Sequence, residues 1–421
     1  MPQRYSVVGV SSLATGPEVK HAIGAADGCG ARSPDGEVID VQLATLSYTA
    51  ATGWSDTLPG LDSDRTLVIA FGAPGFGADP RPFDDLARAF PGASIVGCST
   101  AGEIIGTDLR DDSIVVAAAR FESSTLRTAS AAVRASEESF TAGQDIARRL
   151  ADPALRGVLV LSDGLSVNGS ELVRGLNSVL PPSVVITGGL AADGDRFGAT
   201  WVLDEGRPAT GIVRGVGLYG DALRIGHGSM GGWDIFGPER TVTRARANVL
   251  YELDGRPALD LYKSYLGELS GGLPATGLLF PLAIRPAGAR PDDASLVRTI
   301  LAVDEDDQSM TFAGDMPEGA RAQLMRANVD RLIEGAADAA LMVDRGAGAG
   351  PTLALGVSCV GRRLVLGERT QEEIEAAVEC LPDGVQQIGF YSYGEISPHA
   401  SGLCELHNQT MTLTTIHETA G

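Results

Sequence analysis

A strand–helix–strand–loop–strand plan occurs three times in this sequence, and it constrains the fold more than any other feature. The first copy runs over 66–120, the second over 157–220 and the third over 352–416. Each copy opens with an apolar, β-branched run, continues with apolar residues at helical spacing, and returns to β-type alternation. Such self-similarity indicates one structural unit that the chain builds three times.

The loops of the three copies also correspond. Gly97 follows Thr66 by 31 residues, Gly188 follows Gly157 by 31, and Gly389 follows Thr352 by 37. The first and third loops share the pattern G-x-x-[ST]-x-G-E-I, which begins at Gly97 and at Gly389. These loops therefore occupy equivalent places, after the second strand of each copy.

The order of elements predicts an α/β to α+β fold, with mixed β-sheets flanked by helices. A layered α-β-β-α sandwich is one arrangement that fits. The antiparallel step after each strand–helix–strand unit argues against a purely parallel sheet. We expect helices over 83–90, 138–151, 169–180, 319–340 and 370–381, with Ser170 as a cap and with Thr370 and Glu373 as a capping box.

The segment 221–350 does not follow the repeat, and it contains a predicted hairpin around 297–314. We therefore expect two domains, 1–236 and 237–421. The formal charge of −21 over 421 residues argues against a general nucleic-acid role, because phosphate binding needs a basic surface. No apolar run approaches 18 residues and the start does not read as a signal peptide, so we expect a cytoplasmic protein without membrane insertion.

The Gly-rich loops are the first candidates for chemistry, since ligands of open α/β sheets bind beyond the carboxyl ends of strands. In the first loop, Ser99 and Thr100 carry hydroxyls, Gly102 lets backbone approach a ligand, and Glu103 suits an ammonium group. An alternative is that these residues only shape and cap a turn.

The second loop and the segment 161–171 offer charged groups with the same two interpretations. Asp193, Asp195 and Arg196 could bind the two ends of a zwitterion or form a polar turn. Asp163, Ser166 and Asn168 precede a predicted helix, whose backbone amides could hold a carboxylate. Asx-turn and capping chemistry would use the same residues.

Catalytic and metal signatures are weak. The serine spacing G-x-S-x-x-G is not a nucleophile elbow, and no phosphate-binding glycine motif occurs. The cysteines form no C-x-x-C pair, and the histidines lack zinc spacing. We therefore expect no enzyme. Two alternatives remain: haem ligation by His407 or His227, and a nucleophile at Cys98, with His407 and Asn408, or at Ser99. The five cysteines are Cys29, Cys98, Cys359, Cys380 and Cys404, and the five histidines are His21, His227, His399, His407 and His417.

Several strings resemble the FIST family of signalling sensors: GCSTAGEI, TGGLAADG, NVLYELDGRPALDLYKSYLG and GFYSYGEISP, followed by HNQTMTLTT. The resemblance spans roughly 30–417 and implies an N-terminal and a C-terminal FIST domain. It also implies sensing of a small ligand such as an amino acid, and in some members haem-based sensing of nitric oxide. No output domain follows in this sequence, so we expect a separate partner, such as a histidine kinase or a cyclic-di-GMP enzyme.

Combining the loops with the resemblance, we expect a non-catalytic sensor whose ligand lies between 97–104, 188–197 and 389–396. The cofactor is left unknown, with haem as the alternative. The predicted ligand-binding residues are Ser99, Thr100, Gly102, Glu103, Asp163, Gly188, Gly189, Asp193, Arg196, Tyr393, Glu395 and Asn408.

Overall fold

Every residue of strand β3 (Thr66–Gly72) is buried, although successive side chains point to opposite faces of a strand. Such a strand needs cover on both faces. The computed structural model describes residues 41–290, 295–343, 351–399 and 402–419, which belong to one compact unit. Cys29 and His21 lie outside these residues. In the described part, strands equivalent to β3 open all three copies of the repeat.

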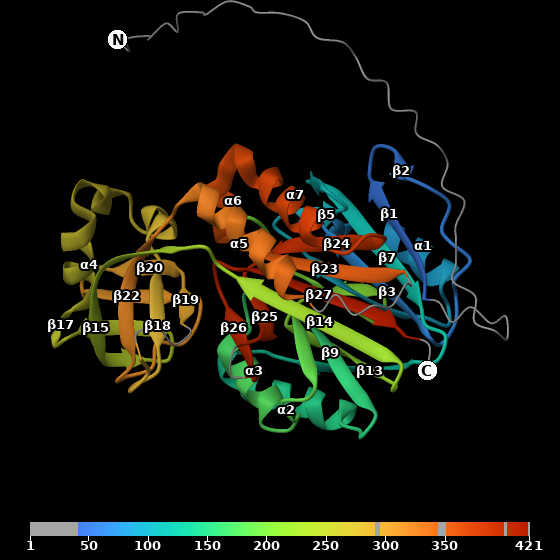
Figure 1. The fold of residues 1–421 in the computed structure, drawn as a ribbon, viewed down its shortest axis with the longest axis horizontal. Coiled ribbons are helices and arrows are strands. Elements are labelled where there is room, and N and C mark those ends of the chain that lie inside the picture. Colours follow the sequence, from blue (N-terminus) through green and yellow to red (C-terminus); the bar gives the residue numbers. More distant parts are fainter. Residues whose placement is uncertain (1–40, 291–294, 344–350, 400–401, 420–421) are drawn as a thin grey trace, which may run out of the picture. The chain divides into compact units, whose positions relative to one another are not determined.

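The three copies form three mixed sheets with one common order of strands (Figure 1). Each sheet has a central parallel pair, β3 with β4, β9 with β10, or β23 with β24. The last strand of the same copy lies antiparallel beside the first one. The first sheet runs β12 (Arg207–Ala209), β11 (Val202–Asp204), β4 (Ser94–Ser99), β3, β7 (Ser113–Arg120), β1 (Gln42–Thr49), β2 (Gly53–Trp54).

The other two sheets repeat that order. The second runs β26 (Cys404–His407), β25 (Gly394–Pro398), β10 (Val185–Leu190), β9 (Leu155–Ser162), β13 (Ile212–Tyr219), β8 (Thr125–Ala132). The third runs β6 (Asp108–Arg110), β5 (Glu103–Ile105), β24 (Val385–Ser392), β23 (Thr352–Cys359), β27 (Met411–Glu418), β14 (Leu223–Met230). The prediction of mixed sheets flanked by helices is confirmed, and the repeat is structural.

The hairpins between the second and last strands are exchanged in a cycle. Hairpin β5–β6 of the first copy pairs with β24 of the third. Hairpin β25–β26 of the third pairs with β10 of the second, and β11 of the second pairs with β4 of the first. Each copy therefore completes the sheet of another, which ties the three copies together.

The inner faces of all three sheets meet in one apolar core, to which β3 contributes Phe71, β9 contributes Leu161 and β24 contributes Phe390. Helices cover the outer faces: α1 (Arg81–Ala89) on the first sheet, α2 (Ser139–Leu150) and α3 (Gly169–Asn177) on the second, α5 (Val329–Met342) and α7 (Thr370–Cys380) on the third. Figure 1 shows α2 and α3 on the outer side of β9 and β13. Three sheets thus replace the two-sheet sandwich considered from sequence.

The glycine that opens each loop is required by strand packing. A Cβ on Gly97, Gly188 or Gly389 would overlap the backbone carbonyl of the neighbouring parallel strand. Gly188 also has a φ of +136°, which favours glycine. These glycines let two strands approach each other, and their role is internal to the sheet.

An inserted subdomain, residues 234–326, separates the second copy from the third. Its sheet runs β19 (Leu296–Arg298), β18 (Leu282–Arg285), β22 (Arg321–Arg326), β15 (Asp234–Arg246), β16 (Val249–Leu253), β21 (Ser309–Phe312), β20 (Ile300–Asp304), with β17 (Arg256–Pro257) beside β16. Helix α4 (Ala258–Leu266) packs on it, and β20 and β21 form the predicted hairpin. The division at 236 falls just inside this subdomain and stays a prediction.

Several local predictions need correction. The helix expected over 319–340 begins only at Val329, because Arg321–Arg326 pair with β15 and β18 as a strand. Asn168, not Ser170, caps α3, with its side chain accepting from the amide of Glu171. Thr370 is already helical, and Glu373 turns inward to a buried arginine instead of forming a capping box.

The remaining short helical segments are α6 (Val360–Leu366) and the 3₁₀ turns Pro74–Ala78, Ser136–Glu138, Gly267–Gly272, Ala275–Leu279 and Gly367–Arg369. Within the described ranges, no helix combines the length and the apolar character needed to cross a membrane.

Candidate functional site

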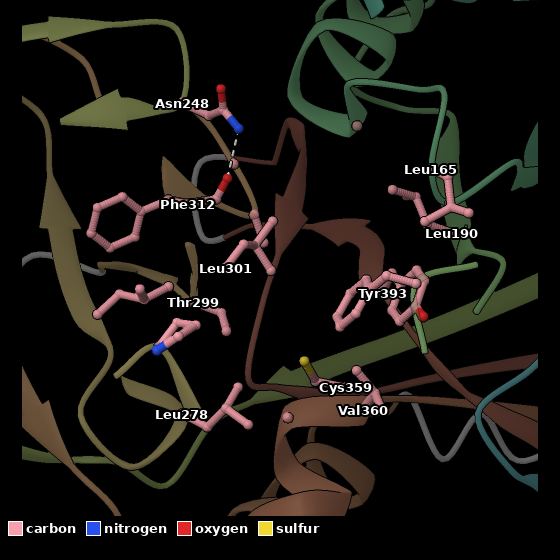
Figure 2. A pocket seen from close by; sticks show the side chains of 18 of the residues that line it. Leu165, Leu190, Asn248, Leu278, Thr299, Leu301, Phe312, Cys359, Val360 and Tyr393 are labelled. Carbon is pink, nitrogen blue, oxygen red and sulfur yellow. Dashed lines mark hydrogen bonds between the residues drawn. The ribbon is translucent and has the colours of Figure 1, made fainter. Parts of the chain in front are cut away.

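A cavity of about 860 Å³ lies where the second copy, the third copy and the inserted subdomain meet. Figure 2 shows Asn248, Thr299, Leu301 and Phe312 of the inserted subdomain on one side and Leu165, Leu190 and Tyr393 on the other. Cys359 and Val360, at the start of α6, lie between these two walls. The cavity thus opens at the carboxyl ends of β9, β10 and β23, where the fold class predicts a ligand.

The cavity walls are mainly apolar, as in most small-molecule sites. Four of the large apolar side chains that line it are also exposed, so apolar surface continues from the cavity to solvent. An exposed apolar patch of this kind marks a binding surface more often than an isolated exposed leucine does. The four are Leu165, Phe197, Leu301 and Leu364.

An aromatic pair forms one part of the wall. The rings of Phe197 and Tyr393 stack with centroids 4.7 Å apart and planes 11° from parallel. The Tyr393 hydroxyl donates to Asp193 and lies 3.0 Å from the carbonyl oxygen of Gly194. Phe197 has a φ of +48°, an uncommon conformation for a bulky residue. The loop is therefore shaped to hold this ring over Tyr393.

Few polar groups face the cavity. Asp195 is the acidic side chain among the described lining residues, and none of these residues is lysine, arginine or histidine. Asn248 donates to the carbonyl of Phe312. The hydroxyl of Thr299 is buried and has no hydrogen-bond partner among the described residues. A ligand would therefore meet one carboxylate, the exposed hydroxyl of Ser136 and mostly carbon.

Glu103 and Glu395, two predicted ligand residues, lie elsewhere and make equivalent internal contacts. Glu103 accepts hydrogen bonds from the hydroxyl of Thr100 and from the hydroxyl and amide of Ser113. Glu395 accepts in the same way from the hydroxyl of Ser392 and from the hydroxyl and amide of Thr410. Each carboxyl joins the start of an exchanged hairpin to the region where the next long strand begins. Burial raises the pKa of Glu103 to about 7 and of Glu395 to about 8.

Asp163 makes the same kind of connection in the second copy. Its carboxylate accepts from the Thr200 hydroxyl and the Gly211 amide, and also from the amides of Leu165 and Ser166. The last two contacts form an Asx-type turn. Asp163 therefore has the turn-forming role that the sequence analysis gave as the alternative to ligand binding. The three buried carboxylates therefore hold the exchanged hairpins and do not line the cavity.

Asp193 supports the aromatic pair. Burial raises the pKa of Asp193, but hydrogen bonds from Tyr393, Ala199 and Gly198 outweigh it and hold that pKa below its usual value. Asp193 is thus a charged group that holds the hydroxyl of Tyr393 by a hydrogen bond. Arg196, three residues further along the loop, is exposed.

The other predicted residues also serve the fold. The Ser99 hydroxyl accepts from the amide of Trp201, and a Cβ on Gly102 would overlap Arg363. Gly189 packs against the backbone of Gly394. Asn408 is fully buried behind Gly394, and its side-chain amide has no partner among the described residues. Of the twelve residues in the predicted ligand-binding set, Tyr393 lines the cavity, and it lies in the predicted loop 389–396. Asp195 and Asn168, two further candidates from the sequence, line the cavity as well.

The histidines considered for haem do not line the cavity. His407 is buried against the carbonyl oxygen of Ser397, 3.1 Å from Nε2, and burial lowers its pKa to about 3. His227 pairs with Thr414 in the middle of β14. Neither histidine therefore fits a haem held in this cavity. In the described ranges, no group of His, Cys, Asp and Glu could hold a metal ion.

The nucleophile alternative at Cys98 finds no positioned base among the described residues. Cys98 is buried in the core between the sheets, and burial raises the pKa of its thiol well above the ordinary value. No hydrogen bond joins Cys98 to His407 or Asn408 among the described contacts. A thiol in such surroundings is inert.

Sequence reasoning missed most of the cavity wall. Thr299, Asn248 and Phe312 belong to the inserted subdomain, which carries no repeat pattern. Phe197 could have been found, because a large apolar residue within a Gly-rich polar loop is unusual. The floor residues of α6 carry no signal in the sequence.

A buried arginine links the cavity floor to the inserted subdomain. Arg362 follows Gly361, a lining residue, and its guanidinium binds Glu373 at 2.7 Å with both side chains 0% exposed. It also donates to the carbonyls of Gly231 and Leu332, which flank the two crossings into and out of the subdomain. One side chain thus holds α6 and both connections together.

Comparison with known proteins places this architecture in a family. The FIST N domain matches residues 66–256 and the FIST C domain matches residues 258–398. A relative, "Uncharacterized protein MJ1623" of Methanocaldococcus jannaschii, is 24% identical over 286 residues, which are 61% of this chain and 53% of that protein. This chain therefore spans about half the length of that relative.

A solved structure, cyanuric acid hydrolase from A. caulinodans, aligns over 90% of this chain and 99% of its own, with 11% identity and a TM-score of 0.36. That likeness is too distant to carry an argument about this chain. The two domain matches together cover most of the sequence, including the first two copies of the repeat in full and the third copy as far as residue 398. The chain therefore belongs to the FIST family, whose domains are associated with sensing in signal transduction.

Proposed function

We propose that this protein is a non-catalytic sensor of a small molecule, and that its ligand occupies the 860 Å³ cavity. The observation that carries the proposal is the origin of the walls. They come from the second copy, the inserted subdomain and the third copy, so an occupant would contact three parts of the chain at once. A ligand that contacts all three parts would bind one arrangement of them more tightly than another, and it would therefore shift the protein toward that arrangement.

An amino acid or a similar small metabolite agrees with the charged groups at this site. Asp195 provides a carboxylate for an ammonium group, and the cavity reaches Asn168 and Gly169 at the start of α3. The positive end of a helix dipole favours a carboxylate there. The apolar walls would then hold the side chain of the ligand.

The signal would pass through α6. Val360, Gly361 and Leu364 line the cavity, while Arg362 of the same helix binds both connections to the inserted subdomain. A ligand that prefers one position of α6 would favour the matching position of the subdomain. We propose that a separate cytoplasmic signalling protein, such as a histidine kinase or a cyclic-di-GMP enzyme, reads that position.

The test is thermal unfolding of the full chain, followed by circular dichroism, with each amino acid and with haemin. A ligand at 100 times its Kd should add about 2.7 kcal/mol to the free energy of unfolding and raise the midpoint. An Ala275→Trp variant places an indole at the cavity wall and narrows the cavity, whereas Ala302→Trp places the same bulk at an exposed alanine that does not line it.

We expect the stabilising compound to lose its effect on Ala275→Trp and to keep it on Ala302→Trp. Equal effects on both variants would contradict the proposed site. A shift with haemin together with a sharp Soret band would favour a haem sensor instead.

A further inference from the structure

We propose that the ligand is an aromatic compound that carries a positive charge, such as an aromatic amine or an aromatic amino acid. This inference rests on the proposed function, because it names the chemical class that the cavity accepts. Two observations carry it: the charge of the lining and the aromatic pair.

The charge of the lining favours a cation. Asp195 supplies one carboxylate, and no described lining residue supplies a positive side chain. An anionic group away from the start of α3 would lose water without gaining an opposite charge. An ammonium group would instead pair with Asp195 at the exposed mouth of the cavity.

The aromatic pair favours a ring. Phe197 is 52% exposed and keeps a φ of +48°, so its side chain is held at the cavity although it gains little burial there. Unusual backbone conformations of this kind persist where the surroundings fix them, and they cluster at binding sites. Here the stack on Tyr393 fixes the ring. Stacked rings bind planar groups and cations through their faces and edges.

The test compares probes that separate charge from aromaticity, with affinities measured by calorimetry on the full chain. Phenethylamine has both properties, 2-cyclohexylethylamine has only the charge, phenethyl alcohol only the ring, and phenylacetate the ring with the opposite charge. We expect phenethylamine to bind at least tenfold more tightly than each of the other three.

Phenylalanine and tyrosine distinguish the two sources of this chemistry. Tighter binding of the amino acids than of the amines would place their carboxylate at the start of α3. Tighter binding of the amines would identify the ligand as an amine. Both results support an aromatic cation.

Two variants assign the contacts. Phe197→Leu should weaken phenethylamine at least fivefold and leave 2-cyclohexylethylamine unchanged, since leucine keeps the bulk but not the ring. Asp195→Asn should weaken phenethylamine about tenfold and leave phenethyl alcohol unchanged. Asp306→Asn, at an exposed acid that does not line the cavity, is the matched control.

Tighter binding of phenylacetate, equal binding of 2-cyclohexylethylamine, or no binding of any aromatic cation would overturn the inference. The proposed function has a separate criterion. If a compound of another class stabilises the wild type but not Ala275→Trp, the cavity is a sensory site with a different ligand. If no compound does so, the proposed function fails as well.

Discussion

Glu395 shows how single buried residues hold the exchanged hairpins. Its carboxyl is fully buried and accepts from Ser392 at 2.8 Å and from the hydroxyl of Thr410 at 2.9 Å. Glu103 repeats the arrangement with Thr100 and Ser113. Because burial disfavours the charged form of a carboxyl, the contribution of these two groups to the free energy of unfolding depends on pH.

The Glu395→Gln substitution should remove part of the pH dependence of stability. Burial raises the folded-state pKa of Glu395 to about 8 from an ordinary value of 4.5. Between these values the folded state keeps a proton that the unfolded state has lost, so stability falls as pH rises. The slope approaches about 1.4 kcal/mol per pH unit for one group.

The useful window is pH 6.5 to 8. Below it, histidines whose pKa burial lowers, chiefly His407, act in the opposite direction. The pKa of Glu103, about 7, adds to the loss only at the lower end of the window. Urea unfolding at several pH values should show a smaller loss for Glu395→Gln than for the wild type. An unchanged slope, matching that of the exposed control Glu379→Gln, would contradict the raised pKa.

The equivalence of the two G-x-x-[ST]-x-G-E-I loops was predictable from sequence, but the role of their glutamates was not. The pattern predicts a ligand loop and a structural turn equally well, because both use hydroxyls and a carboxylate near glycine. What decides is burial. Glu103 is covered because β5 pairs with β24, at Phe390, a strand far along the chain. The residues around Glu103 do not predict that pairing, because the partner strand is distant in the sequence.

Helix α6 is the element through which the cavity and the inserted subdomain are connected. The guanidinium of Arg362 donates hydrogen bonds to the carboxylate of Glu373 and to three backbone carbonyls, those of Gly231, Leu332 and Gln409. Glu373 accepts in addition from Ser358 and from Tyr391. This network joins α6 and α7 to β23, β24 and both connections to the subdomain.

The Arg362→Met substitution should destabilise the protein by about 3–5 kcal/mol, because it leaves the Glu373 charge buried without its partner. The double variant Arg362→Met with Glu373→Leu should lose less, since both charges are then removed. Arg369→Met breaks two exposed pairs, with Asp330 and with Glu372, and should have little effect. Urea unfolding would measure all three. A double variant that loses as much as the single one would contradict this reading of the ion pair.

Elements with a strong local pattern were predicted well, and those fixed by distant partners were not. Strands β3, β9 and β23 are mainly apolar runs, and such runs indicate strands covered on both faces. The residues Arg321–Arg326 resemble the start of a helix, but β15 and β18 pair with them and make them a strand. Tertiary pairing therefore overrode the local preference at that point.

At the level of the whole described chain, three similar sheets share one core, and the inserted subdomain adds the wall that closes the cavity. The repeat predicted the three units and their mixed sheets. It could not predict the cyclic exchange of hairpins, since the order of strands along the chain is the same with or without exchange. The cavity could not be predicted from the repeat either, because Thr299 and Phe312 of its wall belong to the part of the chain that does not repeat.

Amide hydrogen exchange tests the sensory cavity most directly. It would be measured on the wild type with and without whichever compound raises the melting midpoint most. We expect slower exchange in three regions at once: residues 163–169 with 190–197, residues 272–278 with 299–301, and α6. Slowing confined to the loop 97–104, or to one wall alone, would contradict a ligand that joins three parts of the chain.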